Sequence, residues 1–308
     1  RPGVGCGWAG PPGARHREVA MTGPTRDSAA GRAYLDLQSR ARREKRGTQE
    51  LLTMYVIERW WERLSRSRYA GDFVLKGGML LAAFGHRRTT ADADALAFNL
   101  ASEASAVMER VVAVASIPGD DGVDFLTDTV TASVIRDDAL YAGVRVTMSA
   151  RLATAAVKLR LDVNFGDPVT PAPQAMELPA LRPGQPSIPI LGYPVETVLA
   201  EKLVTAIDLG PANTRVRDFV DIYTLIRNEG IDDGQLRSAV AATAAFRGVR
   251  LAPLGESLGD LATTRAAAYS AYRRNLGPDG SHLPATLTDI IDEVLTFMDE
   301  HLEGRAPN

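Results

Sequence analysis

Apolar and polar positions along the chain repeat with two different periods, which predict helices and strands in different regions. Between residues 32 and 67 apolar side chains recur every four positions, as in the series Leu52, Val56, Trp60 and Leu64. This spacing places them on one face of a helix. The pattern therefore predicts an amphipathic helical segment, with Trp60 as a core anchor rather than a platform for stacked bases.

A period of two follows in the middle of the chain. Within residues 155–166, Val157, Leu159, Leu161 and Val163 alternate with polar residues, which is typical of a half-buried strand. Strands are also predicted at residues 72–78, 90–98, 141–150 and 188–191, and helical turns at 79–85 and 103–116. Eight prolines between residues 168 and 194 indicate an irregular connection at the end of this region.

Beyond residue 194 the apolar spacing is helical again. Helices are predicted at residues 195–209, 214–228, 233–246, 257–275 and 286–302. The expected fold class is α+β, with a mixed-sheet lobe followed by an all-helical lobe. The predicted divisions are a disordered leader at 1–30, the first lobe with its N-terminal helices at 31–193, and the helical lobe at 194–308.

Composition narrows the class of protein. The 308 residues are 45% hydrophobic and 24% charged, which is enough apolar material for a core. No apolar run reaches the ~18 residues of a membrane span. The single cysteine excludes a disulfide framework, and the four histidines lack the spacing of zinc ligands. These features predict a cytoplasmic protein outside the membrane.

The first twenty residues differ from the rest. They contain no initiating Met and no continuous apolar run, so they do not resemble a secretory signal. Met21 is the expected start of the native protein, and residues 1–20 are interpreted as upstream sequence.

Charge is unevenly distributed along the chain. Residues 1–90 contain 17 Lys or Arg and 8 Asp or Glu, a net charge of +9, whereas the remainder carries −12. A basic region of this kind suits a polyanionic partner. From the charge counts alone, a solvated helix face is the simpler interpretation.

Two aspartates just after the basic region are candidates for binding a metal ion. Asp92 and Asp94 lie two apart on a predicted strand, so their carboxylates share one face. Hard oxygen ligands in such a pair suit Mg²⁺, with Mn²⁺ as the alternative. A lone pair of this kind is common, and a solvent-facing strand edge would produce it too.

A glycine pair precedes these acids. Gly77 and Gly78 stand at a predicted strand-to-helix junction, where backbone N–H groups can approach phosphate oxygens. An ordinary tight turn is the alternative. Asp162 adds a third carboxylate on the polar face of its strand, where it would either join the metal site or be a satisfied surface residue.

These motifs together resemble a known family. The run from Arg88 to Asp94 reads R-x-T-x-D-x-D and follows a K-G-G strand end; "LDV" (161–163), "ETVLAEKL" (196–203) and "RVRDFVDIYTL" (215–225) come later. In that order and spacing, roughly residues 75–227 resemble the AbiEii/AbiGii nucleotidyltransferase toxin family, which includes the MenT toxins. Ala93 departs from the bulkier residue that is more common between the two acids of that family.

The resemblance implies a polymerase-β-like nucleotidyltransferase lobe and a role for each motif. Gly77, Gly78 and Thr90 would contribute to nucleotide binding, and Asp92, Asp94 and Asp162 would be the metal ligands. Lys202 would reach the NTP phosphates from the helical lobe, although a surface lysine is the alternative. Asp218 would complete the catalytic set, orienting Lys202 rather than binding metal. Asp221, three residues after Asp218, lies on the same face of that helix as Asp218.

The resemblance also implies a function. We expect a Mg²⁺-dependent toxin of a toxin–antitoxin system that transfers NMP from an NTP to the 3′ end of tRNA and so blocks translation. Its partners would be NTP, tRNA and a cognate antitoxin protein. The alternatives are transfer to a small molecule or protein, and a catalytically silent module that binds RNA or the antitoxin.

A polyanionic acceptor changes the interpretation of the basic segment. With RNA expected as substrate, the residues that would contact its backbone are Arg40, Arg42, Arg43, Lys45 and Arg46. Phosphate contacts of this kind would make RNA binding fall steeply with salt.

Overall fold

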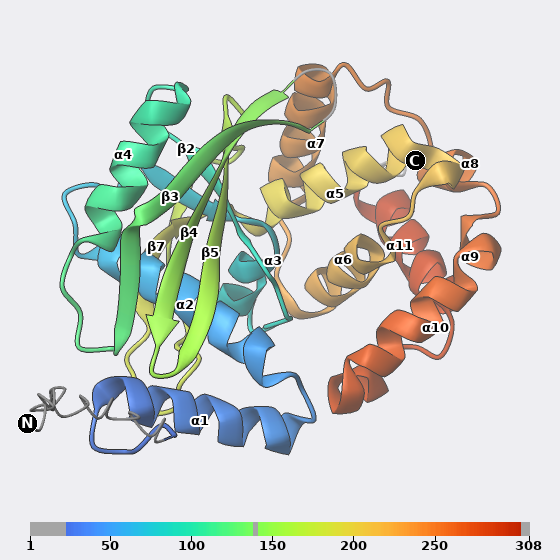
Figure 1. Cartoon of the computed structure of the whole chain (residues 1–308). Helices are drawn as coiled ribbons and strands as arrows, with labels where there is room; N and C mark the ends of the chain where they lie inside the picture. The colour runs from blue at the N-terminus through green and yellow to red at the C-terminus, as the bar shows by residue number, and fades with distance from the viewer. Residues whose placement is uncertain (1–22, 138–140, 303–308) are drawn as a thin grey trace, which may run out of the picture.

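A computed structural model describes residues 23–137 and 141–302 of the chain. A seven-stranded mixed sheet with helices α1, α2 and α4 forms the left side of Figure 1, and helices α5 to α11 form the right side. The α+β fold class is confirmed. Residues 1–22 of the predicted leader lie outside the described residues, and its last two residues belong to α1.

The N-terminal helical segment consists of two helices, α1 (Ala29–Glu44) and α2 (Thr48–Ser65). Lys45 ends α1 in a left-handed conformation with φ 54°, and its N–H caps the carbonyls of Ala41 and Arg42. The sequence analysis treated residues 32–67 as one helical segment, although residues 42–50 contain no apolar position. Trp60 is buried in the core, as the pattern of apolar positions predicted, and Trp61 beside it is buried too.

The sheet has the strand order β3-β4-β5-β2-β1-β7-β6. The strands are β1 (Phe73–Lys76), β2 (Ala93–Ala97), β3 (Val123–Asp137), β4 (Tyr141–Leu152), β5 (Ala155–Phe165), β6 (Gln174–Leu178) and β7 (Ile188–Gly192). β2 pairs in parallel with β5 and antiparallel with β1, while β7 runs parallel to β1. The site motifs therefore lie on adjacent central strands.

Two of these strands were absent from the sequence prediction. In β3 the register with β4 shifts between Leu126 and Thr131, so the strand has no continuous alternation of apolar and polar residues. β6 lies in the proline-rich segment and pairs only with β7 at the edge of the sheet. Prolines are tolerated around an edge strand, because its outer N–H groups have no ladder to join.

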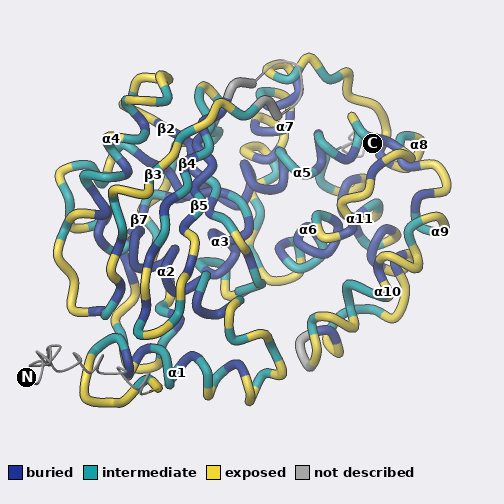
Figure 2. Tube along the Cα trace, in the orientation of Figure 1, coloured by how far each residue is buried: buried dark blue, intermediate teal, exposed yellow. Residues whose placement is uncertain are grey.

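Short helical elements connect the strands. α3 (Gly77–Leu80) and a 3₁₀ turn (Leu81–Phe84) follow β1, and α4 (Ala104–Ala115) follows β2. Helices α2 and α4 pack against the sheet, and α1 packs on α2. In Figure 2 the buried residues gather where α2 and α3 meet the sheet.

The helical part begins directly after β7. Its helices are α5 (Val195–Leu209), α6 (Val216–Asn228), α7 (Asp233–Arg247), α8 (Leu254–Leu258), α9 (Leu261–Thr264), α10 (Ala266–Asn275) and α11 (Leu287–His301). The segment 257–275, predicted as one helix, contains parts of three: Gly259 adopts φ 53° and ends α8, and Arg265 separates α9 from α10. Among the described residues no helix has the length and apolar character needed to cross a membrane.

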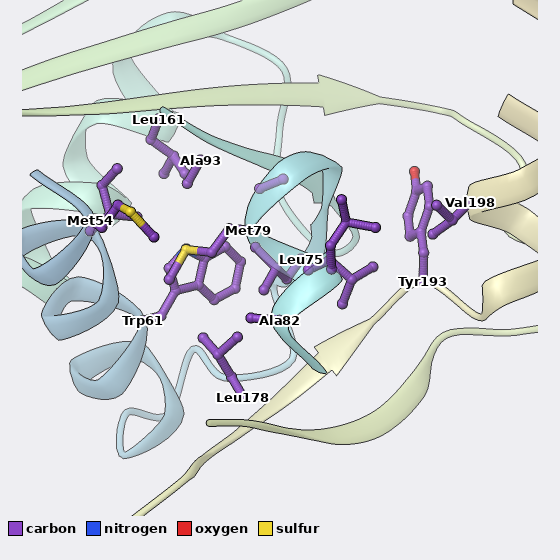
Figure 3. Close-up of a cluster of buried hydrophobic side chains, with 14 of the residues drawn as sticks. Met54, Trp61, Leu75, Met79, Ala82, Ala93, Leu161, Leu178, Tyr193 and Val198 are labelled. Atoms are coloured by element: carbon purple, nitrogen blue, oxygen red, sulfur yellow. The ribbon is translucent and has the colours of Figure 1, made fainter. Parts of the chain in front are cut away.

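The core lies between α2 and the sheet and continues toward α5. Trp60 packs edge-on against Phe73 of β1 with ring centroids 5.6 Å apart, and its indole N–H donates to the carbonyl of Val111 in α4. Figure 3 shows Trp61, Leu75 and Met79 on the path from α2 through β1 to α3. This packing fixes the end of β1, from which the glycine pair emerges.

Candidate active site

Four charged side chains form a row across adjacent strands. Lys76 pairs in register with Asp94, Asp94 with Asp162, and Asp162 with Arg145, so the row crosses β1, β2, β5 and β4. Residues paired in register project from the same face of a sheet. The two central acids are therefore neighbours, and a basic residue flanks each of them.

The glycine turn makes close contact with this row. Gly77 adopts φ 67°, and a Cβ placed on it would lie 2.0 Å from Oδ2 of Asp94. Only glycine permits both this backbone conformation and this approach of the carboxylate. A Cβ on Gly78 would lie 2.9 Å from the guanidinium carbon of Arg88. The turn thus fits between Asp94 on one side and Arg88 on the other.

Asp92 lies just before β2 and is oriented by its own loop. The Thr90 hydroxyl donates to the Asp92 carbonyl at 2.8 Å and lies 3.1 Å from its Oδ1. Thr90 is buried, so its position is set by the fold. Thr90, which was predicted to bind nucleotide, therefore orients Asp92 in this structure.

Asp94 has an unusual electrostatic environment. Burial, followed by repulsion from Asp92, raises the pKa of its carboxyl from 3.8 to about 6, and Lys76 opposes the shift. No hydrogen bond or ion pair reaches the Asp94 carboxylate from any residue that the structure describes. This position is consequently short of positive charge.

Lys76 is held away from Asp94 by other acids. Its Nζ lies 2.6 Å from Oδ2 of Asp167 and 2.9 Å from Oε1 of Glu201 on α5, over the ring of Tyr193. Burial acts to lower the pKa of Lys76, but Glu201, Tyr193 and Asp167 together hold it well above its usual value. Lys76 is therefore a permanent cation that joins the sheet to the helical part.

Lys202 lies next to Glu201 on α5 but faces a different group of residues. Its Nζ is 2.6 Å from Oδ1 of Asp218 and 2.8 Å from Oδ2 of Asp221, both on α6. Burial opposes the charge of Lys202, whose pKa is nevertheless raised by Asp221 and Asp218. Burial would also raise the pKa of Asp218, yet Lys202 holds it below its usual value. Asp218 thus orients Lys202.

A continuous series of contacts connects the two groups of residues. Nε of Arg88 lies 3.2 Å from Oδ1 of Asp221, so Asp221 is shared between Arg88 and Lys202. Arg88 in turn packs against Gly78. The glycine turn is therefore bordered by Asp94 of the sheet and, through Arg88 and Asp221, by Lys202 of the helical part.

Asp162, the third predicted acid, already has a partner. Nε and Nη2 of Arg145 donate to its two carboxylate oxygens at 2.7 and 2.6 Å. The structure brings Asp162 beside Asp94, as the alternation in its strand indicated, but with both oxygens occupied by a guanidinium.

The carboxylates of Asp92 and Asp94 are candidate ligands for a divalent cation. Asp92 and Asp94 offer carboxylate oxygens without a basic partner, and their mutual repulsion would be relieved by a cation. Across the described part of the chain, no group of three or more His, Cys, Asp or Glu side chains is arranged to hold a metal. The pair fits Mg²⁺, which needs only one or two carboxylates with substrate phosphates.

The predicted RNA-contacting residues fall into two groups. Arg40 and Arg46 pair with Glu44, at 2.7 and 3.9 Å, and Arg40 also donates to the carbonyl of Leu181. The side chains that point into solvent at the end of α1 are Arg42, Arg43 and Lys45. Any polyanion at this surface would meet the second group first.

Sequence reasoning assigned no role to Lys76, Glu201 or Arg145. Lys76 directly precedes the glycine pair, and Arg145 is the only charged residue in the predicted strand 141–150, which was a signal that could have been used. A charged residue within an apolar strand requires a partner on a neighbouring strand. The partner itself could be identified only from the register.

The fold is similar to that of a solved nucleotidyltransferase toxin. MenT4, a nucleotidyltransferase toxin from Mycobacterium tuberculosis H37Rv, is 17% identical with a TM-score of 0.51, over 86% of this chain and 98% of that one. JHP933 from Helicobacter pylori is 16% identical with a TM-score of 0.41, over 83% of this chain and 97% of that one. No protein of curated function matches the sequence.

The sequence itself establishes the family. Residues 59–295 match the model for the nucleotidyl transferase AbiEii toxin of type IV toxin–antitoxin systems. The match includes every residue of the charged row, and it includes α5 and α6, which carry Lys202 and its two acidic partners. The chain therefore belongs to the AbiEii family of nucleotidyltransferase toxins.

Proposed function

We propose that this toxin transfers a nucleoside monophosphate from an NTP to an RNA acceptor, with the 3′ end of tRNA as the acceptor. The observation that carries the proposal is the glycine turn bordered by Asp94 on one side and by the Arg88–Asp221–Lys202 contacts on the other. A triphosphate placed along this turn would extend from a carboxylate pair to a fixed cation.

Asp92 and Asp94 would hold the divalent cation. When bound, Mg²⁺ would neutralise triphosphate charge and act as a Lewis acid at the α-phosphate. The chain itself contributes the position of the two carboxylates, because Thr90 orients Asp92 and Gly77 allows Asp94 to lie against the turn. Asp162, predicted from the sequence as a third ligand, would join them only where its pair with Arg145 opens.

Lys202 and Arg88 would neutralise charge on the phosphates. Both are held by Asp221, so they are positioned before the substrate binds. Preorganised cations favour the transition state, in which negative charge builds up on the departing pyrophosphate. The acceptor hydroxyl attacks the α-phosphorus, the bond to the bridging oxygen breaks, and the hydroxyl proton passes to solvent or a nearby carboxylate.

RNA would lie along the end of α1. Arg42, Arg43 and Lys45 are exposed there, and the carbonyl of Glu44 faces Gly277, just beyond α10 of the helical part. This basic end is therefore next to the boundary between the two parts of the molecule. A cognate antitoxin protein, as the family implies, is the other expected partner.

The acceptor can be tested with two samples of tRNA. Purified toxin, Mg²⁺ and each α-labelled NTP are incubated with intact tRNA or with tRNA whose terminal diol has been oxidised by periodate. The proposal predicts label on intact tRNA and none on the oxidised sample. Equal labelling of both would contradict the 3′ end as acceptor, and label on protein or a small molecule would contradict RNA altogether.

Absence of label on every acceptor has a separate meaning. If folded toxin also fails to bind NTP, the catalytically silent interpretation is supported instead. If NTP is bound, the acceptor assignment is wrong while the nucleotide site stands.

A further inference from the structure

The two central acids of the charged row differ in how their charge is balanced. Both oxygens of Asp162 accept hydrogen bonds from Arg145, whereas Asp94 has no such partner among the residues described here. The Asp162 side chain is 10% exposed, and that of Arg145 is 38% exposed. A two-point guanidinium–carboxylate pair fixes both the orientation and the charge of the acid.

Binding a divalent cation at Asp94 therefore has a different energetic cost from binding it at Asp162. Among the described residues no ion pair involves Asp92 or Asp94, so a cation bound there breaks none and relieves the repulsion between the two carboxylates. A bond to Asp162 requires at least one hydrogen bond from Arg145 to break. The guanidinium also repels an incoming divalent ion.

We propose that Arg145 competes with the divalent cation for Asp162. In the free protein the cation is held by Asp92 and Asp94, and Arg145 keeps Asp162 out of its coordination. Arg145 is thus a positioning residue that determines how many carboxylates reach the metal. The inference rests on the proposed function only in assigning Asp92 and Asp94 as ligands.

Removing Arg145 should expose the third acid. Three neighbouring carboxylates without a basic partner repel one another and attract a divalent ion more strongly than two do. Residues beside metal ligands typically change metal affinity by about 10- to 100-fold when altered. In this case we expect metal affinity to rise rather than fall, because the residue removed is itself a cation.

The test measures Mn²⁺ binding by the nucleotide-free full chain, from the electron paramagnetic resonance signal of unbound Mn²⁺. Arg145→Met should tighten binding by about tenfold, and Asp94→Asn should weaken it by at least about tenfold. Asp162→Asn should change affinity by less than about threefold. In the double variant Arg145→Met/Asp162→Asn the tightening should disappear, because the two changes act on one pair.

A matched control lies on the same strand. Arg151 of β4 pairs with Asp124 of β3 at 2.9 Å, far more exposed than the Arg145–Asp162 pair. Arg151→Met should leave Mn²⁺ affinity unchanged. Thermal unfolding identifies any variant that fails to fold. Arg145→Lys then provides a second comparison, since it keeps the charge but loses the two-point geometry and should tighten binding less.

Several results would overturn the proposal. Unchanged or weaker Mn²⁺ binding by folded Arg145→Met would mean that no competition exists. An equal loss in Asp162→Asn and Asp94→Asn would mean that Asp162 is already a ligand, and absence of Mn²⁺ binding by the wild type would remove the metal site. Normal binding results with no nucleotide transfer would instead contradict the proposed function alone.

Discussion

At the scale of single residues, Asp94 has an electrostatic environment that disfavours its ionised form. Its carboxyl is partly buried beside Asp92 and Asp162, and its pKa is raised to about 6. A raised pKa means that the folded protein favours the protonated form of this acid. The ionised form at neutral pH therefore costs stability, which a bound cation would restore.

This cost predicts a pH-dependent effect of Asp94→Asn on the metal-free protein. At pH values above about 6 the variant should be more stable than the wild type. The gain should be on the order of 1–3 kcal/mol. As pH falls through about 6 toward 3.8, the wild-type carboxyl becomes protonated and the difference should vanish. Chemical denaturation across this pH range measures it; a variant less stable at every pH would contradict the environment described for Asp94.

Gly77 provides a second prediction at this scale. Gly77→Ala combines an unfavourable φ with a clash against the Asp94 carboxylate, whereas Gly184→Ala has a similar φ of 77° and nothing within 4 Å of the new Cβ. The control should lose about 1–2 kcal/mol of stability. Gly77→Ala should lose about 1–3 kcal/mol more, together with Mn²⁺ affinity. Equal losses in both variants would show that the Asp94 contact has no energetic weight.

At the scale of elements, α2 holds the loop that leads into the two acids. The Glu58 carboxylate, fully buried, accepts hydrogen bonds from Arg59, Arg87 and the N–H of Leu181. Arg87 and Arg88 are consecutive but point to opposite sides, one to Glu58 and the other to Asp221. The loop is thus held between α2 and α6, and this determines where Asp92 lies.

Glu58→Gln should therefore destabilise the protein strongly. The change leaves the buried Arg59 and the partly buried Arg87 without their acid, and breaking a buried ion pair typically costs about 3–5 kcal/mol. Glu62→Gln is a suitable control, since Glu62 lies one turn later on α2 and pairs with the exposed Arg66. That change should cost less than about 1 kcal/mol. Urea denaturation of both variants tests the difference, and similar small losses would contradict a structural role for Glu58.

The elements also show how far the sequence could predict the site. Alternation in residues 155–166 and the motif order were sufficient to predict the strands of Asp94 and Asp162 and the proximity of these two acids. The row with Lys76 and Arg145 could not be predicted, because strand register depends on the packing of the whole sheet. The same holds for β3, where a shift in register interrupts the alternation on which prediction depends.

At the scale of the whole molecule, two sets of ion pairs join the sheet to the helices. Lys76 contacts Glu201, and Arg88 shares Asp221 with Lys202. Each set includes one residue next to the glycine turn and one on α5 or α6. The fold therefore places both sides of the proposed triphosphate site in fixed relation before any substrate binds.

The uneven charge of the chain provides a prediction for RNA binding. Replacing Arg42 and Arg43 with Glu should weaken tRNA binding and lower its dependence on salt, while NTP binding stays unchanged. Arg227→Glu is a control, because Arg227 is exposed on α6 and pairs with Glu293. Filter binding at several salt concentrations measures the effect. Equal loss of tRNA and NTP binding in the double variant would contradict the assignment of this surface to RNA.

The central claim is that Asp94 and Lys202, from the two parts of the molecule, serve one nucleotidyl transfer site. The most direct measurement is the rate of label transfer from α-labelled NTP to tRNA by the wild type, Asp94→Asn, Lys202→Ala and the control Glu62→Gln. The control should match the wild type, and each site variant should be slower by at least about 100-fold. Transfer by either folded site variant at the wild-type rate would contradict the claim.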